Sequence, residues 1–184
     1  MGCGDGHLLA GLGPPHLGVD LQPGRLWRSL TGRVVLGRAE ALPFANACFD
    51  GVVLDTVLTL IDDDLAALRE ARRVLLPGGR LALRVAHRTR IRRLAGRPAD
   101  PANLREYDPS SLGDLLARAG FAPRRWTTRY FYAPVAPMLI NRLASVARLY
   151  AGPAAVLRAL GRIVPASLRG HLIVEAVAED VERT

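Results

Sequence analysis

Short apolar runs alternate with helical segments along most of this chain. Runs with the composition of buried strands fall at 16–20, 34–37, 51–55 and 80–86. Because parallel strands need long crossover connections, usually helices, this alternation predicts a parallel sheet covered by helices. We therefore expect an α/β fold with a doubly wound, mostly parallel sheet and helices on both faces.

The remaining elements follow from local signals. A helix is predicted from the acidic start Asp62–Asp64 to about Leu76, where Pro77–Gly79 ends it, and another from Ser110 or Ser111 to Ala119. A strand is expected within 121–132, two amphipathic helices near 139–150 and 153–163, and a last strand near 171–177. A single domain of 184 residues is expected, with a core at 1–133, a helical insertion at 134–170, the last strand at 171–178 and a tail at 179–184.

A glycine cluster precedes the first of these strands. Glycine at positions 2, 4 and 6 permits tight turns and lets backbone N–H groups face a ligand. A short helix at 7–12 follows, and the next strand stops at Asp20, whose carboxylate can accept hydrogen bonds from a ribose diol. This order predicts a nucleoside site, although His7 breaks the dinucleotide pattern G-x-G-x-x-G. A plain glycine turn is the alternative.

The position of the cluster in the chain raises a second expectation. A glycine loop of this kind should follow a strand, and only Met1 precedes it. We expect either an amino-terminal truncation or a start codon that was assigned too late. Because such a strand would lie in the middle of the sheet, we expect its absence to matter.

The charge of the chain is +8 at pH 7, and every residue counted as Lys or Arg is Arg. A basic chain suggests nucleic acid, but abundant Ala, Gly, Pro and Arg without Lys indicates a GC-rich genome. Nucleic-acid binding is therefore not expected. Cys3 and Cys48 have no metal-ligand spacing and suit a reduced, cytoplasmic chain. No secretory signal is expected from the first residues given, and no apolar run reaches the roughly 20 residues of a spanning helix.

Four blocks of the sequence resemble the class I S-adenosylmethionine-dependent methyltransferases, in particular the type 11 group that includes ubiquinone and menaquinone biosynthesis enzymes. The blocks are 2–6, 18–20, 39–44 with 49–50, and 70–79, and the likeness runs from residue 1 to about 121. The resemblance implies a Rossmann-like fold and S-adenosylmethionine as cofactor. It also implies an enzyme that transfers the methyl group by in-line displacement to a small or lipid-like acceptor.

The resemblance also implies the cofactor site. The methionine carboxylate and sulfonium would lie over the glycine loop, the ribose on Asp20, the adenine against the turn 38–40, and the methionyl amino group beside Asp55. The expected cofactor-binding residues are Gly2, Cys3, Gly4, Gly6, Asp20, Leu21, Ala39, Glu40, Asp55 and Thr56. Arg38 replaces an Asp that contacts adenine in many relatives. Thr59 replaces a histidine common in the quinone-type enzymes, so their substrate chemistry is not carried over.

Methyl transfer needs a general base only when the acceptor is protonated at the working pH. His87 is the candidate, because it follows the strand 80–86 at the edge of the sheet where ligands bind. A surface histidine in an arginine-rich loop is the alternative. Tyr107 and Tyr132 are candidates to line an acceptor pocket, with simple packing as the alternative for each. No spacing in the sequence suggests a metal site.

The carboxy-terminal third carries an acid-free run. No Asp or Glu occurs from Leu115 to Val174, and nine arginines do: 118, 124, 125, 129, 142, 148, 158, 162 and 169. One interpretation is a helical lid over the acceptor pocket. The other is contact with an anionic acceptor or with the inner membrane face. The alternative to an enzyme is an inactive or truncated relative that binds an anionic surface through these arginines.

Overall fold

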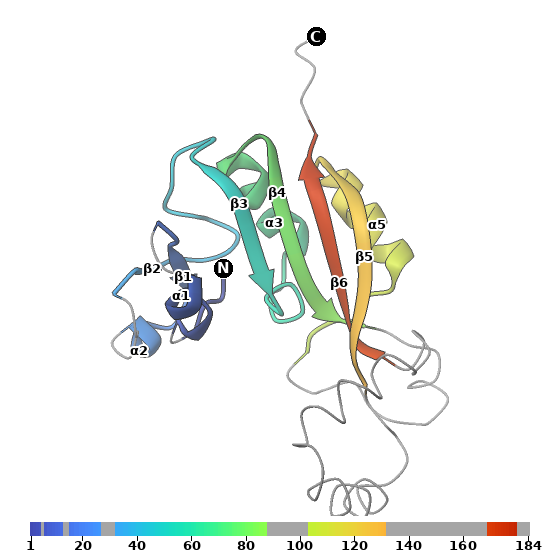
Figure 1. Cartoon of the computed structure of the whole chain (residues 1–184), viewed down its shortest axis with the longest axis horizontal. Helices are drawn as coiled ribbons and strands as arrows, with labels where there is room; N and C mark the ends of the chain where they lie inside the picture. Colours follow the sequence, from blue (N-terminus) through green and yellow to red (C-terminus); the bar gives the residue numbers. More distant parts are fainter. Residues whose placement is uncertain (5, 13–14, 27–31, 88–102, 132–168, 180–184) are drawn as a thin grey trace, which may run out of the picture.

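The computed structural model describes residues 1–4, 6–12, 15–26, 32–87, 103–131 and 169–179 (Figure 1). These residues form two sheets, one pairing β1 with β2 in parallel and the other with the strand order β3-β4-β6-β5. The strands are β1 (Gly18–Asp20), β2 (Val34–Leu36), β3 (Phe49–Asp55), β4 (Leu75–Ala86), β5 (Phe121–Phe131) and β6 (Arg169–Ala178). The helices are α1 (His7–Leu12), α2 (Pro23–Leu26), α3 (Asp64–Val74) and α5 (Pro109–Arg118). The predicted insertion at 134–170 and Tyr132 fall outside the described residues, apart from the first two residues of β6.

The larger sheet mixes parallel and antiparallel pairs. β3 and β4 run in parallel, with Asp55 opposite Arg84, whereas β6 is antiparallel to both β4 and β5. The last strand therefore enters between two strands that precede it in the chain, as Figure 1 shows. The α/β class predicted from the alternation of apolar runs and helices is confirmed. The parallel pairs lie in the amino-terminal half, where that alternation was regular.

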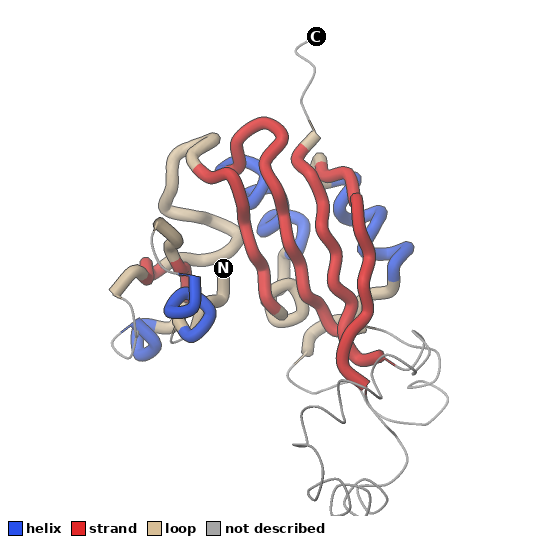
Figure 2. The backbone as a smooth tube through the Cα atoms, viewed as in Figure 1, coloured by secondary structure: helices blue, strands red, loops and turns tan. Residues whose placement is uncertain are grey.

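The core lies between the larger sheet and the two longer helices, α3 and α5, which cover the same face of the sheet (Figures 1 and 2). Alternate residues of the strands point into it, including Val52 and Leu54 of β3, which are 9% and 1% exposed. From the helices, the core includes Ala67, Leu68, Ala71, Val74, Leu112, Leu115 and Leu116. Each large aliphatic side chain buried in this way contributes about 1.5–3 kcal/mol relative to its exposed state.

The helix starts are fixed by acidic caps. Asp63 accepts a hydrogen bond from the Ala66 amide at 2.9 Å, which confirms the acidic start predicted for α3. The predicted cap of α5 at Ser110 or Ser111 is wrong, because Asp108 is the N-cap. Asp108 Oδ1 accepts from the Ser111 amide at 2.9 Å, and the Ser111 hydroxyl accepts from the Asp108 amide at 3.1 Å. This reciprocal capping box leaves Pro109 within the first turn, where it needs no hydrogen-bond acceptor for its nitrogen.

The boundary between α3 and β4 also differs from the prediction. The helix ends at Val74 rather than Leu76, and β4 begins at Leu75 rather than Arg80. Leu75 pairs with Phe49, and the register then shifts so that Gly51 pairs with Arg80. Gly78 adopts φ 70° within the intervening bend, which is a conformation that favours glycine. Pro77–Gly79 therefore shapes the first part of the strand instead of separating the helix from it.

Within the described residues, β1 and β3 are not paired with each other or with a common strand, so they belong to separate sheets. Residues 1–3 join the two sheets, because the Met1 amino group donates to Val53 O at 2.6 Å and the Cys3 amide donates to Val19 O at 3.1 Å. The carboxyl ends of β1 and β3 are thereby held together. Below this link a cavity of about 70 Å³ is lined by Met1, Leu17, Val19, Leu42, Phe44, Phe49, Gly51, Val52, Val53 and Val74.

Candidate functional site

The glycine loop folds tightly at the ends of β1 and β3. Gly2 has φ 64°, and a Cβ at this residue would lie 2.3 Å from Cγ2 of Val57, so no side chain fits there. Gly4 is buried with φ 58°. A chain of this kind brings backbone atoms, rather than side chains, close to whatever binds over it.

Asp20 is the buried acid of the site, with only 7% of its surface exposed. Its Oδ2 accepts a hydrogen bond from the Gly4 amide at 2.8 Å, and its Oδ1 accepts one from the Gln22 amide at 3.0 Å. Each carboxylate oxygen can accept a further bond, since an ionised carboxylate has about four lone-pair sites. Asp20 therefore fixes the glycine loop, a role that the sequence did not suggest, and keeps capacity for hydroxyl donors. Leu21, beside it, is exposed.

The turn after β2 lies next to Asp20. The Gly37 amide donates to Asp20 O at 3.1 Å, and the Ala41 amide closes the turn by donating to Arg38 O at 3.3 Å. Arg38 Nη2 lies 3.2 Å from Glu40 Oε1, so the charge of Arg38 is paired within the turn. Ala39 is partly buried against the core. The structure thus brings the expected residues Ala39 and Glu40 close to Asp20.

The end of β3 supplies a second carboxylate. Asp55 forms an ion pair with Nε of Arg84, the residue opposite it on β4. Thr56 follows with φ 60°, a left-handed conformation that is costly for a β-branched residue and is commonly found at functional sites. The Thr56 amide donates to Arg84 O at 2.8 Å, and the Thr59 hydroxyl donates to Thr56 O at 2.8 Å. Arg84 was not predicted, because only the register of two strands places it beside Asp55.

The two halves of the site meet at the first residues of the chain. Desolvation lowers the pKa of the Met1 amino group, while the charges of Cys3, Asp55 and Asp20 oppose that shift. The carboxylates of Asp20 and Asp55 therefore both act on the Met1 amino group. Pairwise contacts thus connect these parts, because Gly4 and Gly37 are also bonded to Asp20.

His87 lies directly beyond β4 and is only 8% exposed, so the alternative of a surface histidine is wrong. It forms a bridge with Tyr107, whose amide donates to Ala86 O at 2.9 Å. The Tyr107 hydroxyl lies 2.8 Å from Asp64 Oδ2 and 3.1 Å from Leu58 O, and its single proton can be donated to either. Burial, followed by the bond to Asp64, raises the pKa of Tyr107. Tyr107 is therefore a buried packing residue behind His87.

The described residues show neither a metal site nor a membrane-spanning helix. Within the ranges given above, no group of three or more His, Cys, Asp or Glu side chains is arranged to hold a metal ion. No helix in those ranges is both long enough and apolar enough to cross a membrane. The arginines at 142, 148, 158 and 162 lie outside the described residues.

The amino-terminal half of the sequence matches a known family. Residues 1–83 match the family described as "Methyltransferase domain". The demethylmenaquinone methyltransferase of Mycolicibacterium paratuberculosis is 33% identical over 135 residues, which cover 59% of this chain and 58% of that protein. The chain thus spans less than two thirds of the length of this relative.

Solved structures share the fold. A protein of Thermotoga maritima, named as an S-adenosylmethionine-dependent methyltransferase and a possible histamine N-methyltransferase, superposes with a TM-score of 0.68 at 21% identity, covering 97% of this chain and 80% of that one. The [4+2]-cyclase SpnF superposes with a TM-score of 0.64 at 23% identity, covering 97% of this chain and 72% of that one. These likenesses show a Rossmann-like architecture, which agrees with the predicted fold.

Proposed function

Because residues 1–83 match a methyltransferase domain and a demethylmenaquinone methyltransferase is 33% identical over 135 residues, we propose that the chain belongs to the class I S-adenosylmethionine-dependent methyltransferases and binds S-adenosylmethionine at the carboxyl ends of β1, β2 and β3. We propose further that it transfers the methyl group to a small or lipid-like acceptor. The observation that carries the proposal is the bond from the Gly4 amide to Asp20 Oδ2, at 2.8 Å. It unites the glycine loop and the buried acid in one site, as a nucleoside ligand requires.

The residues at this edge fit the chemical groups of the cofactor. The glycine loop offers close backbone approach for the methionyl part, with Gly2, Cys3, Gly4 and Gly6 as its members. Asp20 accepts the two ribose hydroxyls, and Leu21 flanks them. The backbone of Ala39 and Glu40 faces the adenine, because the side chain of Arg38 is paired with Glu40. Asp55 and Thr56 accept from the methionyl amino group, with Arg84 sharing the charge of Asp55.

When bound, S-adenosylmethionine supplies a methyl group activated by its sulfonium. The protein has to hold the acceptor in line with that group and exclude water from it. Asp20, the glycine loop and the turn 38–40 fix the nucleoside end. His87 accepts the proton of the acceptor, where one has to leave, at a ring nitrogen held beyond β4. Its burial supports this role, since a base shielded from water is held in one orientation.

The nature of the acceptor rests on a relative and on the surface near the site. The relative is named as acting on demethylmenaquinone, a lipid-like quinone. Leu60 and Leu104 are 52% and 57% exposed, and the Leu104 amide donates to Thr59 O at 2.8 Å, so both apolar side chains flank the segment that follows Thr56. This pair supports an apolar acceptor. Thr59, in place of the family's histidine, argues against assuming the same quinone.

Ribose recognition by Asp20 gives the most specific test of the proposal. Titration calorimetry should show that S-adenosylhomocysteine binds the parent more tightly than its 2′-deoxyribose analogue. Asp20→Ala should weaken the binding of S-adenosylhomocysteine by about 1.5–3 kcal/mol, the value of a hydrogen bond to a charged group. It should also reduce the preference over the deoxy analogue, because the group that reads the hydroxyl is gone.

Asp50→Ala serves as a matched control, since it removes the same kind of side chain from an exposed residue near the amino end of β3, at the opposite end of that strand from Asp55. Circular dichroism would show whether the Asp20→Ala chain stays folded after losing the bonds to Gly4 and Gln22. An Asp20→Ala variant that is folded and still prefers the ribose ligand as strongly as the parent would remove the basis of the site.

A further inference from the structure

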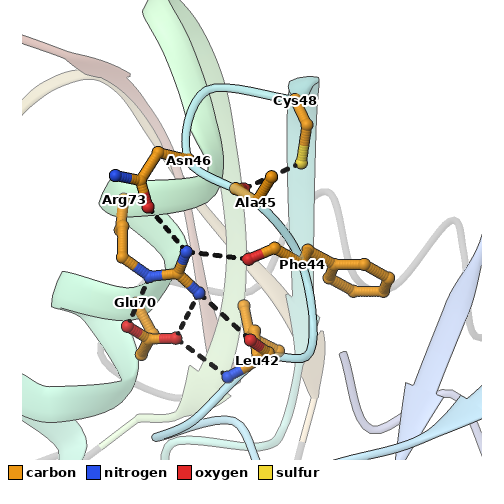
Figure 3. A network of polar contacts seen from close by, with 7 residues as sticks. All are labelled: Leu42, Phe44, Ala45, Asn46, Cys48, Glu70 and Arg73. Atoms are coloured by element: carbon orange, nitrogen blue, oxygen red, sulfur yellow. Dashed lines mark hydrogen bonds and ion pairs between the residues drawn. The ribbon is translucent and has the colours of Figure 1, made fainter.

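Two charged side chains of α3 hold the loop that connects β2 to β3. Figure 3 shows Glu70 and Arg73 facing the loop that carries Leu42, Phe44 and Asn46. The helix block that contains them carried part of the family resemblance, and nothing in the proposed function uses it. The contacts are numerous for two side chains that lie at the surface.

Arg73 donates to three acceptors in the loop. Its Nη1 donates to Phe44 O and to Asn46 Oδ1, each at 2.8 Å, and its Nη2 donates to Leu42 O at 3.1 Å. Its own backbone oxygen accepts from the Ala47 amide at 2.9 Å, and Ala47 has the left-handed φ of 49°. A guanidinium with donors in a fixed plane can satisfy several carbonyls at once, which an ammonium cannot do in the same geometry.

Glu70 completes the network (Figure 3). Its carboxylate pairs with Arg73 through two bonds, Nε to Oε1 at 2.7 Å and Nη2 to Oε2 at 2.8 Å. Oε2 also accepts from the Leu42 amide at 2.8 Å, so both peptide groups of Leu42 are held by α3. The hydrogen bond from Arg73 is the main reason that the pKa of Glu70 is lowered, and the Leu42 amide adds to it.

The turn that follows β2 is consequently anchored at both ends. At its start the Gly37 amide is bonded to Asp20 O, and a Cβ on Gly37 would lie 3.0 Å from Cδ of Pro43. At its end, Leu42 is 7% exposed and bonded to Glu70 and Arg73. Ala39 and Glu40 lie between these anchors, and so their backbone has little freedom to shift.

We propose that Glu70 and Arg73 are positioning residues that fix the backbone of the turn 38–41. This backbone contacts the base of the bound nucleoside and selects adenine. This inference rests on the proposed function. Hydrogen bonds from a rigid backbone distinguish adenine, which has an exocyclic amino donor, from hypoxanthine, which has an oxygen acceptor in its place. A site built to make such bonds rejects the wrong partner because its buried polar groups are then left unpaired. A turn whose backbone can shift loses that discrimination between adenine and hypoxanthine.

The experiment compares S-adenosylhomocysteine with S-inosylhomocysteine, its deaminated analogue, by titration calorimetry. The parent should prefer the adenosyl ligand by roughly tenfold or more, the usual effect of one well-placed hydrogen bond to a buried group. Arg73→Ala should bring this ratio close to one while retaining some binding of both ligands. Glu70→Gln, which keeps an acceptor for the Leu42 amide but loses the pair with Arg73, should give an intermediate ratio.

Arg72→Ala is the matched control. Arg72 directly precedes Arg73 in α3. Its Nη2 donates to Glu179 O, just after the end of β6, instead of to the loop. The two alanine variants remove the same side chain from the same helix turn, and so a general loss of helix stability affects both. Thermal melts followed by circular dichroism give the stability of each chain, and only Arg73→Ala should lose base selectivity.

The outcomes separate this inference from the proposed function. A folded parent that binds neither ligand would contradict the proposed function itself. A parent that binds both ligands equally, or an Arg73→Ala variant with the selectivity of the parent, would overturn the positioning role while leaving the cofactor site in place. Where Arg73→Ala does not fold, Glu70→Gln decides, because selectivity equal to that of the parent overturns the role in the same way.

Discussion

Asp20 combines two tasks at the scale of a single residue. It holds the glycine loop through the Gly4 amide and is proposed to hold the ribose with its remaining lone pairs. The sequence predicted ribose binding, because an acid that ends a strand after a glycine loop is the usual acceptor for ribose hydroxyls in α/β sheets. The loop contact, the Asp55–Arg84 pair and the left-handed Thr56 could not be predicted, since each depends on which residues the folded chain brings side by side.

His87 carries the prediction about proton transfer. His87→Ala should lower turnover of any acceptor that the chain methylates by about 10²–10⁴-fold, the usual contribution of a general base, and leave the affinity for S-adenosylhomocysteine unchanged. The measurement is the pH dependence of turnover. The two profiles should differ in shape, because only the parent holds an imidazole that can take the proton of the acceptor. If both chains show the same profile, positioning alone accounts for the reaction.

Glu70 carries a prediction about acid. Its pKa is lowered from 4.5 by the bond with Arg73, so its contribution to stability is present above pH 4.5 and is lost as the pH falls through the folded-state value. Glu70→Gln should therefore be less stable than the parent at pH 7, by about 0.5–1 kcal/mol for this partly exposed pair. Urea unfolding at pH 7 and pH 3 should show the difference shrinking in acid. A difference that is constant with pH would contradict the ionic contribution.

At the scale of elements, strands and helices were predictable where apolar residues repeat with a clear period. The helix at 7–12 was predicted at its observed bounds. The strands at 51–55 and 171–177 were predicted to within two residues, because each contains three consecutive large apolar residues, at 52–54 and 172–174. Two boundaries differ from the prediction. The start of β4 at Leu75 depends on its pairing with Phe49, and the start of α5 after Asp108 depends on a capping box. Neither contact can be predicted from local sequence.

The capping box of α5 gives the prediction at this scale. Asp108→Ala should destabilise the chain by about 1 kcal/mol, the typical cost of losing an N-cap acceptor. Ser110→Ala should change the free energy of unfolding little, because Ser110 is exposed and takes no part in the box. Denaturant unfolding of the two variants makes the comparison. Equal losses would contradict Asp108 as the single cap and favour Ser110, one of the two residues that the sequence suggested.

At the scale of the whole molecule, the described residues leave β1 and β3 in separate sheets, joined through residues 1–3. Leu17 and Val53 are 47% and 44% exposed, and both line the apolar cavity between the two strands. Parallel strands of an α/β sheet are normally buried on both faces, so these exposed side chains depart from the usual arrangement.

A strand placed in that space should stabilise the molecule. A stretch of about five apolar, β-branched residues joined before Met1 would span roughly 17 Å, similar to a typical strand. Such an extension should raise the melting temperature and strengthen binding of S-adenosylhomocysteine, because residues 1–3 would then continue a paired strand. A polar extension of the same length is the control. Equal effects of the two extensions would show that the space between β1 and β3 does not accept a strand.

The central claim is that the glycine loop, Asp20, the turn 38–41 and Asp55–Thr56 form one cofactor site across the two sheets. Amide hydrogen exchange with and without saturating S-adenosylhomocysteine tests it most directly, because it reports on every segment at once. The account predicts added protection in residues 2–6, 18–22, 37–42 and 55–57, and little change in α5 or in the pairing of β5 with β6. Protection confined to β5 and β6, or no ligand-dependent protection anywhere, would contradict it.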